Sequence, residues 1–215
     1  MKKRLSFFGG TGGLGMGVFE LLSGYEVKPV GSALLNLHGC NPDKLNEFFS
    51  ENPTDIAVIF SNYNFNSFLH KYHNEPFPLE KQLEINVVGI TKLIAAALTY
   101  MRKQKYGRII IASSVTVDVN VMGTAVYAAA KAFHENLVKT IALENAGLGI
   151  TANCLQLGYM DGGLTNTLSE DFLKQKIEAI PAKRLGRVDE IAHAVKFLIE
   201  NEYVNGATLK LTGGL

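Results

Sequence analysis

The feature that most restricts the fold of this chain is a series of short apolar runs, each separated from the next by a longer stretch, most of them with helical periodicity. Asp55–Phe60 (DIAVIF) has the unbroken apolar character of a strand that is covered on both faces. Strands of this kind occur in parallel sheets, whose crossover helices lie on the two faces. The sequence predicts seven strands, at Leu5–Phe8, Glu26–Val30, Leu34–Leu37, Asp55–Phe60, Arg108–Ala112, Thr151–Leu155 and Thr208–Leu211.

Helical patterns fill most of the stretches between these runs. Because strands and helices alternate and crossovers are right-handed, we expect a Rossmann-type, doubly wound α/β fold: a parallel sheet of about seven strands with helices on both faces. No internal repeat or linker interrupts the pattern, so residues 1–215 are expected to form a single domain. The predicted helices are Met16–Leu22, Pro42–Ser50, Leu79–Lys103, Ala125–Ala146, Ser169–Ile177 and Val188–Ile199.

The charge balance favours a small-molecule partner. The 215 residues include 21 basic and 20 acidic side chains, so no excess of either sign indicates nucleic acid or an anionic membrane. The two cysteines, Cys40 and Cys154, form no metal-binding pattern, and no metal is expected. The apolar start Leu5–Phe8 breaks into glycines, unlike a signal peptide, and Val87–Leu98 is too short to span a bilayer. We therefore expect a cytoplasmic protein.

A glycine-rich run, GGTGGLG at positions 9–15, follows the first predicted strand and opens the first helix. Glycine lets the backbone approach a pyrophosphate closely, and the helix behind it offers free N–H groups and the positive end of its dipole. Such a run by itself could be a flexible turn, but its position between strand and helix favours dinucleotide binding. The residues expected to contact the cofactor here are Gly9, Thr11, Gly13, Leu14 and Gly15.

The end of the second predicted strand bears on the choice of cofactor. It reads Val30-Gly31-Ser32, without the acidic residue that would hold the adenosine ribose hydroxyls and repel a 2′-phosphate. Ser32 could instead bond that phosphate, although no arginine is present. The sequence therefore favours NADP(H) slightly over NAD(H).

Tyr127 and Lys131 lie four residues apart near the start of a predicted helix, within YAAAK. This spacing places the phenol and the ammonium on one face. A phenol with a pKa of about 10 is a poor acid–base catalyst at neutral pH, and a neighbouring ammonium would lower that pKa. Alone, the pair is more often part of a solvated helix face, so its interpretation depends on the rest of the chain.

Two further polar residues are candidates for the same site. Ser114 ends the strand RIIIASS, at the carboxyl edge where ligands bind in parallel sheets, and could bond a substrate oxygen. Ser113 competes for that role, or serves only to bond the strand end. Asn86 interrupts an apolar helix in LEINVVGI and is either a satisfied buried amide or a functional one that holds a water molecule.

Together these motifs resemble the short-chain dehydrogenase/reductase family, in its single-domain branch, and most of all the 3-oxoacyl-carrier-protein reductases and related ketoreductases. The loop GGTGGLG is similar to the family's Gly-x-x-x-Gly-x-Gly, and YAAAK to its Tyr-x-x-x-Lys. Ser114 lies at the family's usual distance of thirteen residues before the tyrosine, and INVVG fits its helical asparagine. ITANCLQLG, RLGRVDEIAHAVKFL and NGATLKLTGGL resemble the family's last segments, so the likeness covers nearly the whole chain.

The resemblance implies an oxidoreductase that interconverts a carbonyl and a secondary alcohol. Tyr127 would be the general acid in reduction, Lys131 would lower its pKa and hold the nicotinamide ribose, Ser114 would orient the carbonyl, and Asn86 would hold a water that connects Lys131 to solvent. Ser61 would also contact the cofactor. The family implies a substrate lid at residues 163–181, and a homodimer or homotetramer.

The chain also departs from the family pattern. Ile59-Phe60-Ser61-Asn62 replaces Asn-Asn-Ala-Gly, Leu157-Gly158 replaces Pro-Gly beside the cofactor, and the connection after the second strand is short. These changes motivate an alternative function, a catalytically weak or inactive NADP(H)-binding sensor or scaffold of the same fold. A sugar-nucleotide epimerase or dehydratase is a third interpretation, but those relatives carry a larger C-terminal region.

Overall fold

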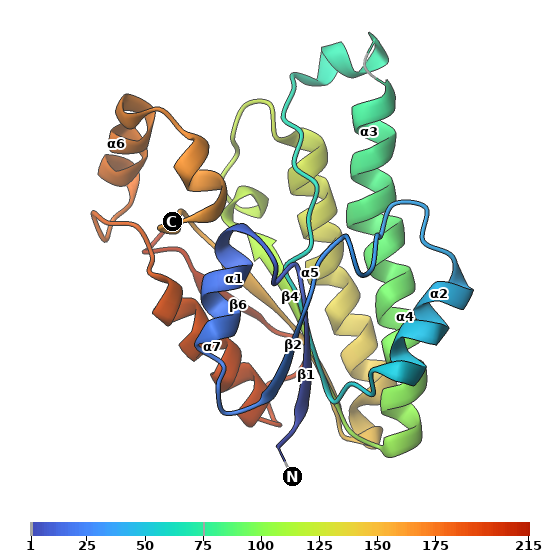
Figure 1. Cartoon of the computed structure of the whole chain (residues 1–215). Coiled ribbons are helices and arrows are strands. Elements are labelled where there is room, and N and C mark those ends of the chain that lie inside the picture. The colour runs from blue at the N-terminus through green and yellow to red at the C-terminus, as the bar shows by residue number, and fades with distance from the viewer. Residues whose placement is uncertain (1, 75) are drawn as a thin grey trace.

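The computed structural model describes residues 2–74 and 76–215. Six strands form one parallel sheet in the order β2-β1-β3-β4-β5-β6, with helices on both faces (Figure 1). The expected doubly wound α/β fold is therefore confirmed. The strands are β1 (Arg4–Phe8), β2 (Glu26–Val30), β3 (Ile56–Ile59), β4 (Gly107–Ser114), β5 (Ile150–Leu157) and β6 (Thr208–Leu211).

The prediction of a strand at Leu34–Leu37 is wrong, and the described sheet has six strands where about seven were expected. After β2 the backbone turns at once: the N–H groups of Leu34 and Leu35 both donate to the carbonyl of Gly31. These bonds close a turn and leave no extended segment to pair with the sheet. Leu35 and Leu37 are nevertheless buried, which accounts for the apolar pattern. As a result β2 is an edge strand.

The helices are α1 (Gly13–Glu20), α2 (Pro42–Glu51), α3 (Pro76–Leu83), α4 (Ile90–Gln104), α5 (Ala125–Asn145), α6 (Glu170–Ala179) and α7 (Val188–Glu200). A π-helical segment, Glu84–Gly89, joins α3 to α4, so the long helix expected at Leu79–Lys103 is continuous but not regular. Short 3₁₀ segments lie at Leu69–Asn74, Val115–Val117, Ala146–Leu148 and Gly163–Thr167.

The alternation of side chains along the sheet produces two separate cores. Ile109 and Ile111 of β4 pack with α2, α4 and α5 on one face, while Ile110 and Ala112 pack with α1 and α7 on the other. This is the environment in which a strand needs apolar residues at every position. Figure 1 shows α1 and α7 on one side of the sheet and α2, α4 and α5 on the opposite side.

The helical stretch Phe77–Gln104 has the length and composition that could cross a membrane, and it extends well beyond the run Val87–Leu98 that the sequence suggested was too short. Length and composition are weak evidence for a membrane span. Here the residues Ile90, Leu93 and Ile94 are buried in the core against the sheet. The α4 part of this stretch is thus packed into the core.

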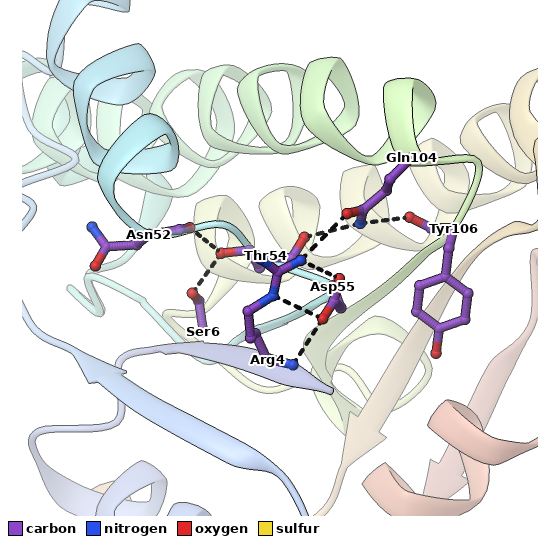
Figure 2. A network of polar contacts seen from close by, with 7 residues as sticks. All are labelled: Arg4, Ser6, Asn52, Thr54, Asp55, Gln104 and Tyr106. Carbon is purple, nitrogen blue, oxygen red and sulfur yellow. Dashed lines mark hydrogen bonds and ion pairs between the residues drawn. The ribbon is translucent and has the colours of Figure 1, made fainter. Parts of the chain in front are cut away.

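The two ends of the sheet differ in what surrounds them. At the amino ends of β1 and β3, Arg4 and Asp55 form an ion pair at 2.8 Å inside a network that includes Ser6 and Thr54 (Figure 2). At the carboxyl ends, the chain crosses from β2 on one side of β1 to β3 on the other. Open α/β sheets bind ligands at such a point.

Candidate active site

A cavity of about 890 Å³ lies over the carboxyl ends of β1, β3, β4 and β5. Its lining contains every catalytic and cofactor-binding candidate from the sequence except Asn86. Segments distant in the sequence therefore meet at one place. The candidates in the lining are Gly9, Thr11, Gly13, Leu14, Gly15, Ser32, Ser61, Ser114, Tyr127, Lys131 and Gly158.

The glycine loop is packed too tightly for side chains at two positions. Gly9 has φ +88°, and a Cβ atom there would lie 2.7 Å from the backbone nitrogen of Ser61. A Cβ on Gly15 would lie 2.1 Å from the carbonyl oxygen of Gly9. Because glycine lacks this atom, the start of α1 can lie directly against the end of β1, and the end of β1 against the segment that follows β3. The N-cap residue of α1, Gly12, makes no side-chain cap, so the first N–H groups of the helix face the cavity side uncapped.

This loop fits the pyrophosphate of a dinucleotide. An uncapped helix N-terminus with a backbone cradle stabilises an anion through free N–H groups and the helix dipole. Gly158 lies at the far side of the cavity, where its N–H donates to Leu211 and where a Cβ would meet Thr212 at 2.9 Å. A backbone of this kind, without side chains, allows a flat ring to approach.

The cavity lining, which includes Gly31 and Ser32 at the end of β2, carries almost no charge. A Cβ on Gly31 would lie 2.1 Å from Oγ1 of Thr11, so the Thr11 hydroxyl occupies the space that a side chain at position 31 would need. Ser32 follows in the lining. Among the described residues that line the cavity there is no carboxylate, and Lys131 is the one charged side chain.

Ser114 and Tyr127 both line this cavity, and the Ser114 hydroxyl lies close enough to the phenol to influence its pKa. The hydroxyl oxygen of Ser114 also accepts hydrogen bonds from the backbone and the side chain of Thr116, at 3.3 and 3.0 Å. Because both Thr116 groups donate, the Ser114 proton remains available to the Tyr127 oxygen or to a substrate oxygen. Thr116, which the sequence did not single out, thus orients the serine.

Burial raises the pKa of Tyr127, and the nearby Ser114 hydroxyl opposes this only in part. This differs from the expectation that Lys131 lowers the phenol's pKa. The ammonium lies 5.6 Å from the centre of the Tyr127 ring and donates instead to the carbonyl of Ala112 at 2.9 Å. Tyr127 therefore retains its proton at neutral pH, as an acid must.

Lys131 is 3% exposed, and burial lowers its pKa to about 8. Desolvation disfavours the charged form of a lysine, and a single carbonyl compensates for little of that loss. At pH 7 the amine is still mostly protonated. Two of its three N–H donors remain for a ligand in the cavity.

Asn86 is fully buried behind the cavity wall. Its amide oxygen accepts from the N–H of Tyr63 at 2.9 Å, and its amide nitrogen donates to the carbonyl of Tyr63 at 2.7 Å. The side chain is therefore occupied by the loop after β3. Its backbone carbonyl pairs with Nε2 of His134 at 2.5 Å, a contact that the sequence did not predict.

Ser113, the competing candidate, donates to Glu135 at 2.5 Å. Its hydroxyl is committed to that carboxylate, which also accepts from Gln156. Ser114 is consequently the serine with a free donor. No group of three or more His, Cys, Asp or Glu side chains within residues 2–74 and 76–215 could hold a metal ion.

Known proteins are similar to this chain over most of its length. A family model described as "Enoyl-(Acyl carrier protein) reductase" matches residues 57–215. The 3-oxoacyl-[acyl-carrier-protein] reductase MabA of Mycobacterium tuberculosis is 31% identical over 167 residues, which cover 77% of this chain and 67% of that protein. The corresponding reductase FabG of Escherichia coli is 38% identical over 135 residues, covering 62% of this chain and 55% of FabG.

The aligned part thus spans between about half and two thirds of these relatives. The residues that the family model matches include Ser114, Tyr127 and Lys131 but not the glycine loop at positions 9–15. The chain belongs to the short-chain dehydrogenase/reductase family of NAD(P)-dependent oxidoreductases.

Proposed function

We propose that the chain reduces a ketone to a secondary alcohol, with Tyr127 as the general acid. The observation that carries this proposal is the gathering of Ser114, Tyr127 and the buried Lys131 in one cavity, which the glycine loop also lines. An acid, an oxygen-binding donor and a buried cation around one point are what carbonyl reduction requires.

The geometry supports the following proton steps. Tyr127 holds its proton at neutral pH and gives it to the carbonyl oxygen, which Ser114 binds through its free O–H. Lys131 stabilises the phenolate that results and binds the nicotinamide ribose with its remaining donors. When bound, the reduced nicotinamide supplies the hydride that the carbonyl carbon takes. Asn86 supports this arrangement from behind the wall, and its side chain is held by Tyr63.

We propose NADP(H) as the preferred cofactor over NAD(H). Gly9, Gly13, Leu14, Gly15, Ser61 and Gly158 supply backbone around the pyrophosphate and nicotinamide, as the packing of Gly9 and Gly15 supports. A lining without carboxylates offers no repulsion to a 2′-phosphate, and the hydroxyls of Thr11 and Ser32 can bond it. The ratio of kcat/KM for NADPH over NADH tests this: a ratio above one is expected, and a ratio well below one contradicts it.

We propose that residues 163–181 close over the substrate. Leu168 and Phe172 line the cavity, and α6 has no fully buried residue. Segments with few buried contacts open at low cost in free energy. The lining near them, with Val121 and Met122, is partly apolar, so a 3-oxoacyl thioester or a medium-sized ketone is the first substrate to test.

We also propose a cytoplasmic homodimer or homotetramer. Phe133 and Leu143 on α5 are exposed apolar side chains, the latter 84% exposed, of the kind that subunit interfaces cover. Light scattering after gel filtration measures the assembly directly. A monomer at all concentrations would contradict this proposal and leave the proposed reaction unaffected.

The test of the reaction is the absorbance of reduced nicotinamide during incubation with a panel of ketones and 3-oxoacyl thioesters. We expect turnover by the wild type and a loss of about a thousandfold in Tyr127→Phe, because the variant keeps the ring but has no proton to give. Equal turnover by both proteins would contradict the role of Tyr127. Tight NADPH binding without turnover of any substrate would instead support the sensor function.

A further inference from the structure

We propose that His134 is a positioning residue for the reaction: it locks the carbonyl of Asn86 and so fixes α5, which carries Tyr127 and Lys131, against the helix α3–α4. The inference rests on the proposed carbonyl reduction. It starts from a buried histidine that the mechanism does not use.

His134 is fully buried, and its Nε2 lies 2.5 Å from the backbone oxygen of Asn86. Since a carbonyl only accepts, Nε2 carries the proton of the ring. Burial, and after it the charge of Lys131, lowers the pKa of His134 to about 3, against the opposing effect of this hydrogen bond. The imidazole is therefore neutral across the working pH range. Within the described residues its Nδ1 has no hydrogen-bond partner, so Nε2 makes the one polar contact of the ring.

The helix is distorted at the point where His134 binds. In a regular α-helix the N–H of Ile90 would donate to the carbonyl of Asn86, four residues before it. In the π segment it donates instead to the carbonyls of Ile85 and Val87. The turn thus releases the Asn86 oxygen from the helix, and a buried released carbonyl needs a donor. His134 is that donor.

The contact joins three parts of the site. Asn86 also holds Tyr63, whose loop contributes Asn62 and Asn64 to the cavity wall. On α5, His134 follows Lys131 by three residues and Tyr127 by seven, which places all three on one helix face. A shift of α5 at His134 is therefore transmitted to the acid and to the ammonium. Displacements of about 1 Å in such groups can cost on the order of a hundredfold in rate.

Three substitutions separate the hydrogen bond from the volume of the ring. His134→Leu fills the space but donates nothing. His134→Gln carries an amide N–H at the distance of Nε2, whereas His134→Asn is one bond too short to reach the Asn86 oxygen. Val138→Ala, one turn further along the buried face of α5, is the control for a loss of packing alone.

We expect kcat to fall by at least about tenfold in His134→Leu and in His134→Asn, with the Kd for NADPH changed less than about threefold. His134→Gln is expected to recover kcat to within about threefold of the wild type. Val138→Ala is expected to lower Tm while leaving kcat unchanged below the unfolding transition. Recovery by Gln is an effect that a purely structural role would not produce, because all three variants disturb the core.

Unchanged kcat in His134→Leu, or equal losses in the Leu and Gln variants, would overturn the proposal. So would recovery by Asn and not by Gln, since that pattern assigns the role to Nδ1. These outcomes leave the reaction itself intact. A wild type that turns over no carbonyl, by contrast, overturns the proposed function and this role with it.

Discussion

Two buried cations at opposite ends of the sheet show how this chain separates stability from chemistry. Arg108, at the amino end of β4, is 1% exposed and donates to the carbonyls of Ile199, Gly107 and Gly149 and to Glu202. Lys131, beside the carboxyl end of β4, is as deeply buried but donates within the described chain to the single carbonyl of Ala112.

The difference has a physical meaning. A buried charge with most of its donors paired is retained at little cost in free energy, whereas one with few partners is retained at a larger cost. Arg108 and the network around Arg4 and Asp55 in Figure 2 find their partners within the chain. At the carboxyl ends the donors of Lys131 and Ser114 are left for ligands.

The largest effect is expected from Lys131→Met, which should lower kcat/KM by about a thousandfold, because it removes the cation that we propose to stabilise the tyrosinate. Its unfolding free energy should not fall, since Met fills the space without a buried charge. The folded-state pKa of about 8 lies below that of the unfolded chain, so the protonated amine weakens the wild type fully below pH 8 and less as pH rises toward 10.

The advantage of Lys131→Met over the wild type should therefore be greatest below pH 8 and shrink above it. Steady-state kinetics and urea unfolding at several pH values measure both effects. A variant that loses stability together with activity would remove the contrast between the two cations.

Arg108→Met is the matched change at the other end, with an expected loss of about 3 kcal/mol in unfolding free energy. The reason is that three backbone carbonyls lose their donor. The carbonyls of Ile199 and Gly107 are buried, so water cannot replace the lost hydrogen bonds. At temperatures where the variant is folded, kcat/KM should be within about twofold of the wild type. A large loss of activity in the folded variant would mean that the two ends are coupled.

The sequence predicted the glycine loop, Ser114 and the Tyr127–Lys131 pair, because each depends on spacing along one or two elements. Spacing alone could not show that Leu34–Leu37 does not form a strand. Whether an apolar segment forms a strand depends on a free partner edge, and here the backbone bonds to Gly31 instead.

The pairing of His134 with Asn86 was equally inaccessible. It joins residues 48 positions apart and exists because a π turn releases one carbonyl. The direction of the Tyr127 pKa was missed for a similar reason: spacing of four residues puts the ammonium on the same face, but only the packing shows that it bonds to Ala112.

A comparison of Ser114→Ala with Ser113→Ala tests which of the two serines at the carboxyl end of β4 has a donor left for a ligand. Ser114 has a free donor and Ser113 gives its proton to Glu135. We expect Ser114→Ala to lower kcat/KM by about thirtyfold, near the effect of losing one hydrogen bond to developing charge, and Ser113→Ala by less than about threefold. Kinetics with one ketone measure both. The reverse order would assign the substrate oxygen to Ser113.

The smallest effect is expected from Asp55→Asn, at about 1.5 kcal/mol of unfolding free energy with kcat unchanged. Burial by itself raises the pKa of Asp55, but the side-chain and backbone hydrogen bonds from Arg4 outweigh it, and the pKa lies below the ordinary value. Since the carboxylate is favoured in the folded chain, its contribution is complete above pH of about 4 and declines as pH falls further.

The difference between wild type and Asp55→Asn should accordingly be constant from pH 5 to 7 and shrink below pH 4. Because Arg4 is partly exposed, salt should weaken the same difference. Urea unfolding across this pH range, with and without about 0.5 M sodium chloride, measures both trends. A difference that persists undiminished into acid would show that the Asp55 contacts act through shape and not through charge, and the amino end would then resemble an ordinary packed core.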